Sequence, residues 1–133
     1  MSSVTANEGT YVLTLDASIA NIQDRFGNIL VVDASDTWVN DLTAPTADIV
    51  DISPDPRNNA VGIVNVNFSE NFTGIDIADF SLTRDGSPVS LSGISVSGSD
   101  ASYSLDLTSV TGANGTYVLT VNSGTGIKDI AGN

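Results

Sequence analysis

GTYVLTL at residues 9–15 returns as GTYVLTV at residues 115–121, 106 residues further along the chain. The similarity extends beyond these two blocks. IQDRFGN at residues 22–28 corresponds to IKDIAGN at residues 127–133, at a spacing of 105, so one residue has been gained or lost between the blocks. A period near 105 residues is the length of one small β-domain, and self-similarity at a fixed period is typical of tandem modules. We therefore expect the chain to begin inside one module and to stop inside the next.

The first copy has the pattern of two strands joined by a loop. Residues 9–17 alternate with a period of two, which predicts a strand with one buried face. Residues 24–28 are a predicted turn, and residues 30–40 are a predicted second strand. The candidate inward residues of that second strand are Leu30, Val32, Ala34 and Trp38. Two strands cannot hold a core alone.

The remainder of the chain has the pattern of a second, larger module. Residues 41–46 form a predicted linker, because Pro45 favours extended geometry before it and cannot donate to a strand ladder. After the linker we expect strands at 47–53, 62–69, 80–82, 89–91, 94–96, 103–107 and 115–121. No stretch shows a helical period of 3.6. Short strands separated by Gly, Pro and Asp predict an all-β fold, an antiparallel Greek-key β-sandwich of the immunoglobulin type.

The charge balance limits the partners of the chain. Sixteen acidic residues face four basic ones, giving a net charge of −12. Such a chain repels nucleic acid and anionic membranes, so we expect no nucleic-acid binding. No run approaches 18 apolar residues, so we expect no membrane insertion of this segment.

Cysteine and histidine are both absent from the sequence. Without cysteine, disulfides, thiolate zinc sites and a cysteine nucleophile are excluded. Without histidine, the Ser-His-Asp triad and imidazole metal sites are excluded. Pairs of acidic residues such as Asp76 and Asp79 are too common here to indicate a glycosidase, so we predict that the protein is not an enzyme.

The repeated Gly-Thr-Tyr opens a strand in both copies. A tyrosine at the start of a late strand resembles the tyrosine corner of immunoglobulin-like sandwiches, in which the phenol bonds to upstream backbone. We predict a structural role for Tyr11 and Tyr117. Trp38 is likewise predicted to pack in a core or between modules.

Taken together, these motifs resemble the bacterial immunoglobulin-like repeats of very large surface and biofilm proteins. The residues that carry the resemblance are Asp41 to Thr46, Phe68-Ser69-Glu70 with Gly74 and Asp79-Phe80, Gly115-Thr116-Tyr117, and Ile127-Lys128-Asp129 with Gly132-Asn133. The resemblance implies a seven-stranded sandwich outside the cell or at its surface. Residues 1–41 would be the last two strands and a turn of a preceding repeat, and residues 42–133 a repeat lacking its final strand.

The place of that final strand can be filled in more than one way. Residues 30–40 would have to reach the far pole of their own second module through a six-residue linker, which spans at most about 20 Å. Filling it within one molecule therefore looks difficult. A neighbouring molecule can donate the strand in a swapped dimer, or the edge can remain exposed.

Several families of such repeats bind calcium where modules meet. The resemblance therefore implies calcium as a candidate cofactor, with ligands drawn from the junction and the central loop: Asp24, Asn28, Asp41, Glu70, Asp76, Asp79, Asp129 and Asn133. Calcium requires six to eight oxygen ligands, and loop carboxylates with carbonyls can supply them. The alternative is that these Asp and Asn residues only stabilise turns through bonds to the backbone.

The sequence thus favours a spacer or adhesion-stalk module, with neighbouring repeats of its parent chain as partners and a cell-surface or matrix ligand elsewhere. The alternative is a carbohydrate- or protein-binding module. Sugar-binding modules usually display exposed aromatic side chains, so the exposure of Trp38 and Phe72 separates the two hypotheses.

Overall fold

The computed structural model describes residues 5–124 and 126–133. The chain divides into a first unit that ends at Thr43 and a second unit, Ala44–Asn133. Both are built from antiparallel strands, which confirms the all-β expectation. The helical residues are a single turn, α1 (Ala17–Ala20), and a short 3-10 helix, η1 (Ile77–Asp79). No helix within the described residues is long and apolar enough to cross a membrane.

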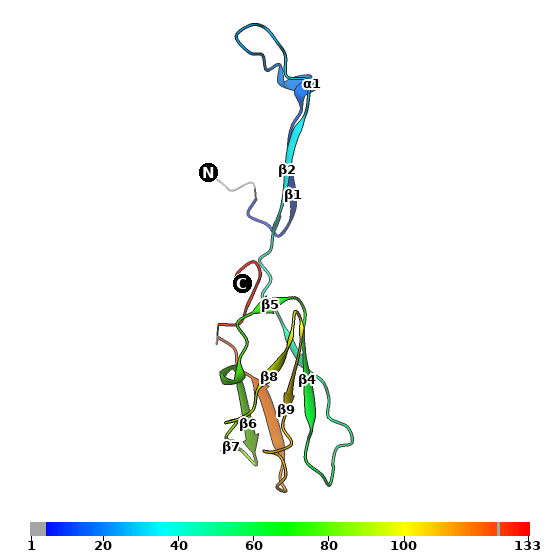
Figure 1. Cartoon of the computed structure of the whole chain (residues 1–133), viewed down its shortest axis with the longest axis vertical. Helices are drawn as coiled ribbons and strands as arrows, with labels where there is room; N and C mark the ends of the chain where they lie inside the picture. Colours follow the sequence, from blue (N-terminus) through cyan, green and yellow to red (C-terminus); the bar gives the residue numbers. More distant parts are fainter. Residues whose placement is uncertain (1–4, 125) are drawn as a thin grey trace. The chain divides into compact units, whose positions relative to one another are not determined.

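The first unit is a long β-hairpin (Figure 1). Its strands β1 (Gly9–Leu15) and β2 (Ala34–Asn40) pair antiparallel, with Tyr11 opposite Trp38. The two rings stack with their centroids 5.9 Å apart. Beyond β1, the side chain of Asp16 caps α1 by accepting the backbone N–H of Ser18 at 2.8 Å. The hairpin thus has its own local order.

The prediction that the second strand of this hairpin turns four side chains into a core is wrong. These side chains are Leu30, Val32, Ala34 and Trp38. None of the described residues of the first unit is buried. Val32 is 70% exposed and Trp38 is 38% exposed. A two-stranded hairpin offers no second sheet against which these side chains could pack.

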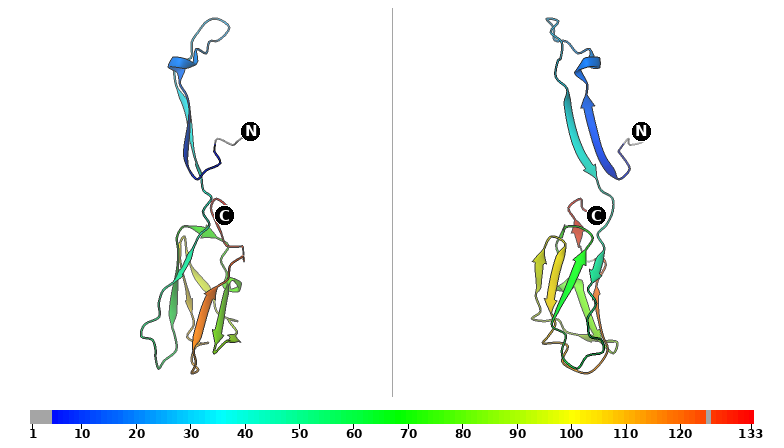
Figure 2. Two further views of the ribbon diagram at one scale, coloured as in Figure 1. Left: turned by 180° about the vertical axis from the view of Figure 1, so that it is seen from behind. Right: turned by 90° about the vertical axis from the view of Figure 1, so that its right-hand side faces the viewer.

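The second unit consists of two main sheets, seen as separate layers in Figure 2. One has the strand order β3-β4-β9-β8 and the other the order β10-β6-β7. The first sheet contains β3 (Ala47–Ile49), β4 (Ile63–Phe68), β9 (Ser102–Asp106) and β8 (Val96–Ser99). The second contains β10 (Tyr117–Val121), β6 (Phe80–Arg84) and β7 (Ser87–Val89). A short pair, β5 (Phe72–Thr73) with β11 (Lys128–Asp129), completes the unit.

The core lies between these two sheets. Val64, Val66, Leu105 and Leu107 come from the first sheet and the segment that follows it, and Phe80 from the second. The period of two along β4 and β9 delivers these residues to one face, because successive side chains of a strand point to opposite sides. A second aromatic cluster joins Phe72 to Phe68 and Tyr103, with ring centroids 4.1 and 5.1 Å from that of Phe72.

Several strand bounds differ from those expected. The strand expected at 47–53 ends at Ile49, and the chain then runs to Pro54 and Pro56, which have no N–H for a ladder. Instead of a strand at 94–96, Ile94 N donates to Leu91 O across a turn, and β8 begins at Val96. The loop expected at 71–79 contains β5 and η1.

Candidate functional site

The loop Asp129–Asn133 is organised around one carboxylate. Asp129 is only 4% exposed. Its Oδ1 accepts the backbone N–H groups of Gly132 at 2.6 Å and Asn133 at 2.9 Å, while its Oδ2 accepts from Asn133 Nδ2 at 2.9 Å. Asp129 therefore fixes the turn with both of its oxygens.

The loop Asp24–Asn28 of the first unit repeats this arrangement. Asp24 Oδ1 accepts the backbone N–H groups of Phe26 at 2.8 Å and Asn28 at 2.9 Å, and Oδ2 accepts from Asn28 Nδ2 at 2.8 Å. In both loops the backbone N–H of the aspartate also donates to the backbone oxygen of the asparagine. The sequence repeat is thus a repeat of local geometry.

The hydrogen bonds in these loops favour ionised carboxylates. The side-chain amide and backbone N–H of Asn28 and the N–H of Phe26 lower the pKa of Asp24. Burial acts to raise the pKa of Asp129, but the bonds from Asn133 and Gly132 outweigh it, so that this pKa is also lowered.

Asp76 and Asp79 form a capping box around η1. Asp76 Oδ1 accepts the backbone N–H of Ala78 at 2.7 Å, and Asp79 Oδ2 accepts the backbone N–H of Asp76 at 2.7 Å. Asp79 is buried, and its backbone oxygen accepts the N–H of Asn122. Both carboxylates therefore have a structural task that the spacing of the two residues could have indicated.

Two predicted metal ligands of the second unit lie close together. Carboxylate oxygens of Glu70 and Asp129 approach within 4.8 Å of each other. Paired carboxylates suit a hard cation such as calcium, but calcium requires further oxygens. In the first unit, the side chain of Asp41 accepts the N–H of Thr43 at 3.1 Å. The calcium role of Asp24, Asn28 and the other candidates remains a prediction.

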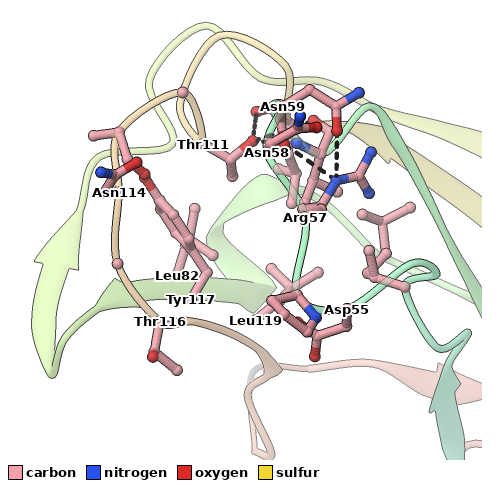
Figure 3. Close-up of a pocket in the computed structure, with 18 of the residues that line it drawn as sticks. Asp55, Arg57, Asn58, Asn59, Leu82, Thr111, Asn114, Thr116, Tyr117 and Leu119 are labelled. Atoms are coloured by element: carbon pink, nitrogen blue, oxygen red, sulfur yellow. Dashed lines mark hydrogen bonds between the residues drawn. The ribbon is translucent and has the colours of Figure 1, made fainter.

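A groove of about 820 Å³ opens on the second unit between the chain around residues 49–59 and the segment 111–119 (Figure 3). Tyr117 and Leu119 of β10 line it together with Leu82 and Arg57. Nε of Arg57 donates to the backbone oxygen of Asn59 at 3.1 Å and to its Oδ1 at 3.2 Å. No local sequence pattern predicts this groove, because its walls come from segments far apart in the chain.

A family model described as a bacterial Ig-like domain matches residues 41–133. No curated protein and no solved structure matches the chain.

Proposed function

The chain belongs to the bacterial Ig-like domain family, and from this premise we propose that it is a non-catalytic spacer or adhesion-stalk repeat of a large extracellular or cell-surface protein. Domains of this type are generally structural modules found outside the cell. The partners in this proposal are neighbouring repeats of the parent chain, and a cell-surface or matrix ligand is engaged elsewhere in that protein. The residues up to Asp41 represent the end of a preceding repeat.

The observation that carries this proposal is the repeated loop. Asp24 with Asn28 and Asp129 with Asn133 make the same three hydrogen bonds to each other, at a spacing of 105 residues. Serial copies of one module are how a chain gains length, since each module contacts only its neighbours. The net charge of −12 keeps such an array soluble and unassociated.

The burial of Phe72 favours a spacer over a sugar-binding module. Phe72 is 4% exposed and packs on Phe68 and Tyr103, so it offers no platform to a sugar ring. Trp38 is 38% exposed, and its ring stacks on that of Tyr11. Mechanical unfolding of the chain held at its two ends tests the spacer role: one discrete step from the second unit supports it, and continuous extension contradicts it.

We further propose that calcium stiffens the junction. The support is the Glu70–Asp129 carboxylate pair, whose oxygens lie within 4.8 Å. Asp41 is included as a ligand for its position in the linker, and backbone carbonyls or waters would supply the remaining oxygens. The ion would neutralise the repulsion between these carboxylates and hold their segments together.

A thermal melt with millimolar calcium, with chelator and with magnesium tests this proposal. A ligand that binds only the folded state raises the melting temperature. The expected rise is several degrees, specific to calcium, and lost in Glu70→Gln and in Asp41→Asn. Asp48→Asn, on the outer strand β3, is the matched control and should keep the rise. A melting temperature that calcium leaves unchanged would contradict the calcium site but not the spacer role.

A further inference from the structure

We infer that the turn before β10 carries a site of spontaneous covalent modification, in which Asn114 cyclises onto the backbone nitrogen of Gly115 and is converted to aspartate and isoaspartate. This chemistry is independent of the spacer role and goes beyond it. Its support is the sequence of the turn, the freedom of its polar groups and the lack of space around Gly115.

The sequence places a reactive pair in this turn. Asn114 is the one asparagine in the sequence that is followed by glycine. Glycine has no Cβ, so its backbone nitrogen is open to approach by the preceding side chain. Asn67 and Asn71 are each followed by phenylalanine, whose side chain hinders that approach. Asparagine is also one of the thermolabile residues of proteins. The pair 114–115 is therefore the most reactive asparagine site in the sequence.

The reaction balances with water as its only co-reactant. The backbone nitrogen of Gly115 attacks the side-chain carbonyl carbon of Asn114, and a C–N bond forms. The amide nitrogen of the asparagine leaves as ammonia, taking the proton of the Gly115 N–H, and a cyclic imide remains. Water then opens this imide at either of its carbonyl carbons. One opening gives aspartate, and the other gives isoaspartate, in which the main chain runs through the former side chain. Neither step oxidises or reduces any atom.

The structure leaves this pair free to react. Asn114 lies on the bend 113–115 that precedes β10 (Figure 3), and both Asn114 and Gly115 are exposed. Among the described residues, none accepts a hydrogen bond from the Gly115 N–H or bonds to the Asn114 amide. By contrast, Nδ2 of Asn28 is held by Asp24 Oδ2 at 2.8 Å. An exposed loop without such a bond can bring the two reacting groups together.

The fold itself requires glycine at position 115. Gly115 has a φ of +148°, which residues with a side chain rarely adopt. An added Cβ would lie 2.6 Å from Asp85 Oδ2 and 2.7 Å from Arg84 Cγ. The equivalent Gly9 of the first unit has a φ of +146°. Because the glycine is fixed by its surroundings, the residue before it decides whether the turn reacts.

The two copies of the turn differ at that position. The residue equivalent to Asn114 is Glu8, at the spacing of 106 that relates the two strands. Glutamate has a carboxylate in place of the amide, so it has no ammonia to release and would have to close a larger ring. The turn of the first unit therefore lacks the reaction. The modification converts Asn114 into an acidic residue, which is the character that Glu8 already has.

Modification changes the main chain beside a structural tyrosine. Tyr117 Oη donates to the backbone oxygen of Ala113 at 2.9 Å, so residue 114 lies inside the loop that this bond closes. Isoaspartate adds one carbon atom to the main chain of that loop. The backbone oxygen of Ala113 must then move relative to the phenol. We expect the bond to weaken and the melting temperature of the second unit to fall.

Mass spectrometry of the chain after incubation in mildly alkaline buffer tests the site. Electron-transfer fragmentation distinguishes isoaspartate from aspartate. We expect both products at residue 114, with isoaspartate in excess, formed several times faster than at any other asparagine. Asn114→Gln is the matched control, because it keeps an amide but must close a larger ring, and it should stay unmodified over the same period. A synthetic peptide of residues 110–119 gives the rate for an unstructured chain, and the folded chain should react at a comparable rate.

Two results would overturn the site. Aspartate at residue 114 without isoaspartate would show direct hydrolysis in place of cyclisation. A folded chain that reacts much more slowly than the peptide would show that the turn protects the asparagine.

The melting temperature of the incubated chain is the second measurement. It should lie below that of the fresh chain, and the difference should be smaller in Tyr117→Phe, which has no phenol to bond Ala113. Incubated and fresh chains that melt together, or an equal difference in Tyr117→Phe, would contradict the effect on this bond.

Discussion

The phenol of Tyr117 donates to the backbone oxygen of Ala113 at 2.9 Å, four residues upstream. Tyr11 makes the same bond to the backbone oxygen of Asn7, also at 2.9 Å. The predicted tyrosine corner is therefore present in both units. Because the first unit has no described buried residue, the bond forms from the local sequence without a second layer of structure.

Replacing Tyr117 by phenylalanine removes one intramolecular hydrogen bond while keeping the ring. The free energy of unfolding of the second unit should fall by about 0.5–1.5 kcal/mol. Denaturation in urea, followed by circular dichroism, measures the loss. Tyr11→Phe is the matched control, since it removes the same bond from the first unit and should leave this transition unchanged. Equal losses in both variants would show that the effect is not local to the corner.

The stability of the second unit should fall in acid because of Asp129. Its pKa is lower in the folded chain, where Asn133 and Gly132 donate to the carboxylate, than in the unfolded chain. The stabilisation is thus present above the unfolded pKa of about 3.9 and is lost as pH falls through the folded pKa.

Melting temperatures measured from pH 6 to pH 2 test this prediction. Asp129→Asn should melt below the parent at pH 6, because the new amide cannot accept every bond that the carboxylate accepts. Its melting temperature should also change less across the acid range. Asp24→Asn alters the equivalent loop of the first unit and should follow the parent curve. If Asp129→Asn keeps the full acid sensitivity, another group is responsible.

Gly98→Ala should destabilise the sheet that contains β8. Gly98 has a φ of +145°, and an added Cβ would meet the backbone oxygen of Ser102 and lie 2.7 Å from Tyr103 Cα. Both contacts are with backbone, so the strands must shift, and the cost should exceed about 1 kcal/mol of unfolding free energy. Gly112→Ala meets nothing within 4 Å and is the control, with an expected change within about 0.5 kcal/mol. Equal stability of the two variants in urea would contradict the geometry.

The sequence was informative wherever a local pattern decides structure. The alternation along residues 62–69 predicted the buried Val64 and Val66, and the repeated Gly-Thr-Tyr predicted the tyrosine corner. Predictions from the sequence failed where contact with a distant segment determines whether a residue is buried or paired. Val32 alternates like a core residue, but it lies before β2 begins at Ala34, in a unit with no second sheet to pack on. The sequence predicts a loop at Phe72 because its partner strand β11 is more than fifty residues away.

The candidate site shows the same division. Asp24, Asp76 and Asp129 lie in turns, as the sequence predicts. Their carboxylates accept backbone N–H groups, as expected for residues that stabilise turns. The proximity of Glu70 to Asp129 depends on the fold of residues 70–129 and could not be obtained from spacing. The groove beside β10 likewise requires two sheets in place.

The most direct test of the structural role is to extend single molecules by their two ends. Residues 44–133 should unfold in one discrete step that releases about 30 nm of chain. Val66→Ala, which empties space at a fully buried position, should lower the force of that step. Val118→Ala, at an exposed position of β10, should leave the force unchanged. Gradual extension with no step, unaffected by Val66→Ala, would show that the unit bears no load and would contradict the spacer role.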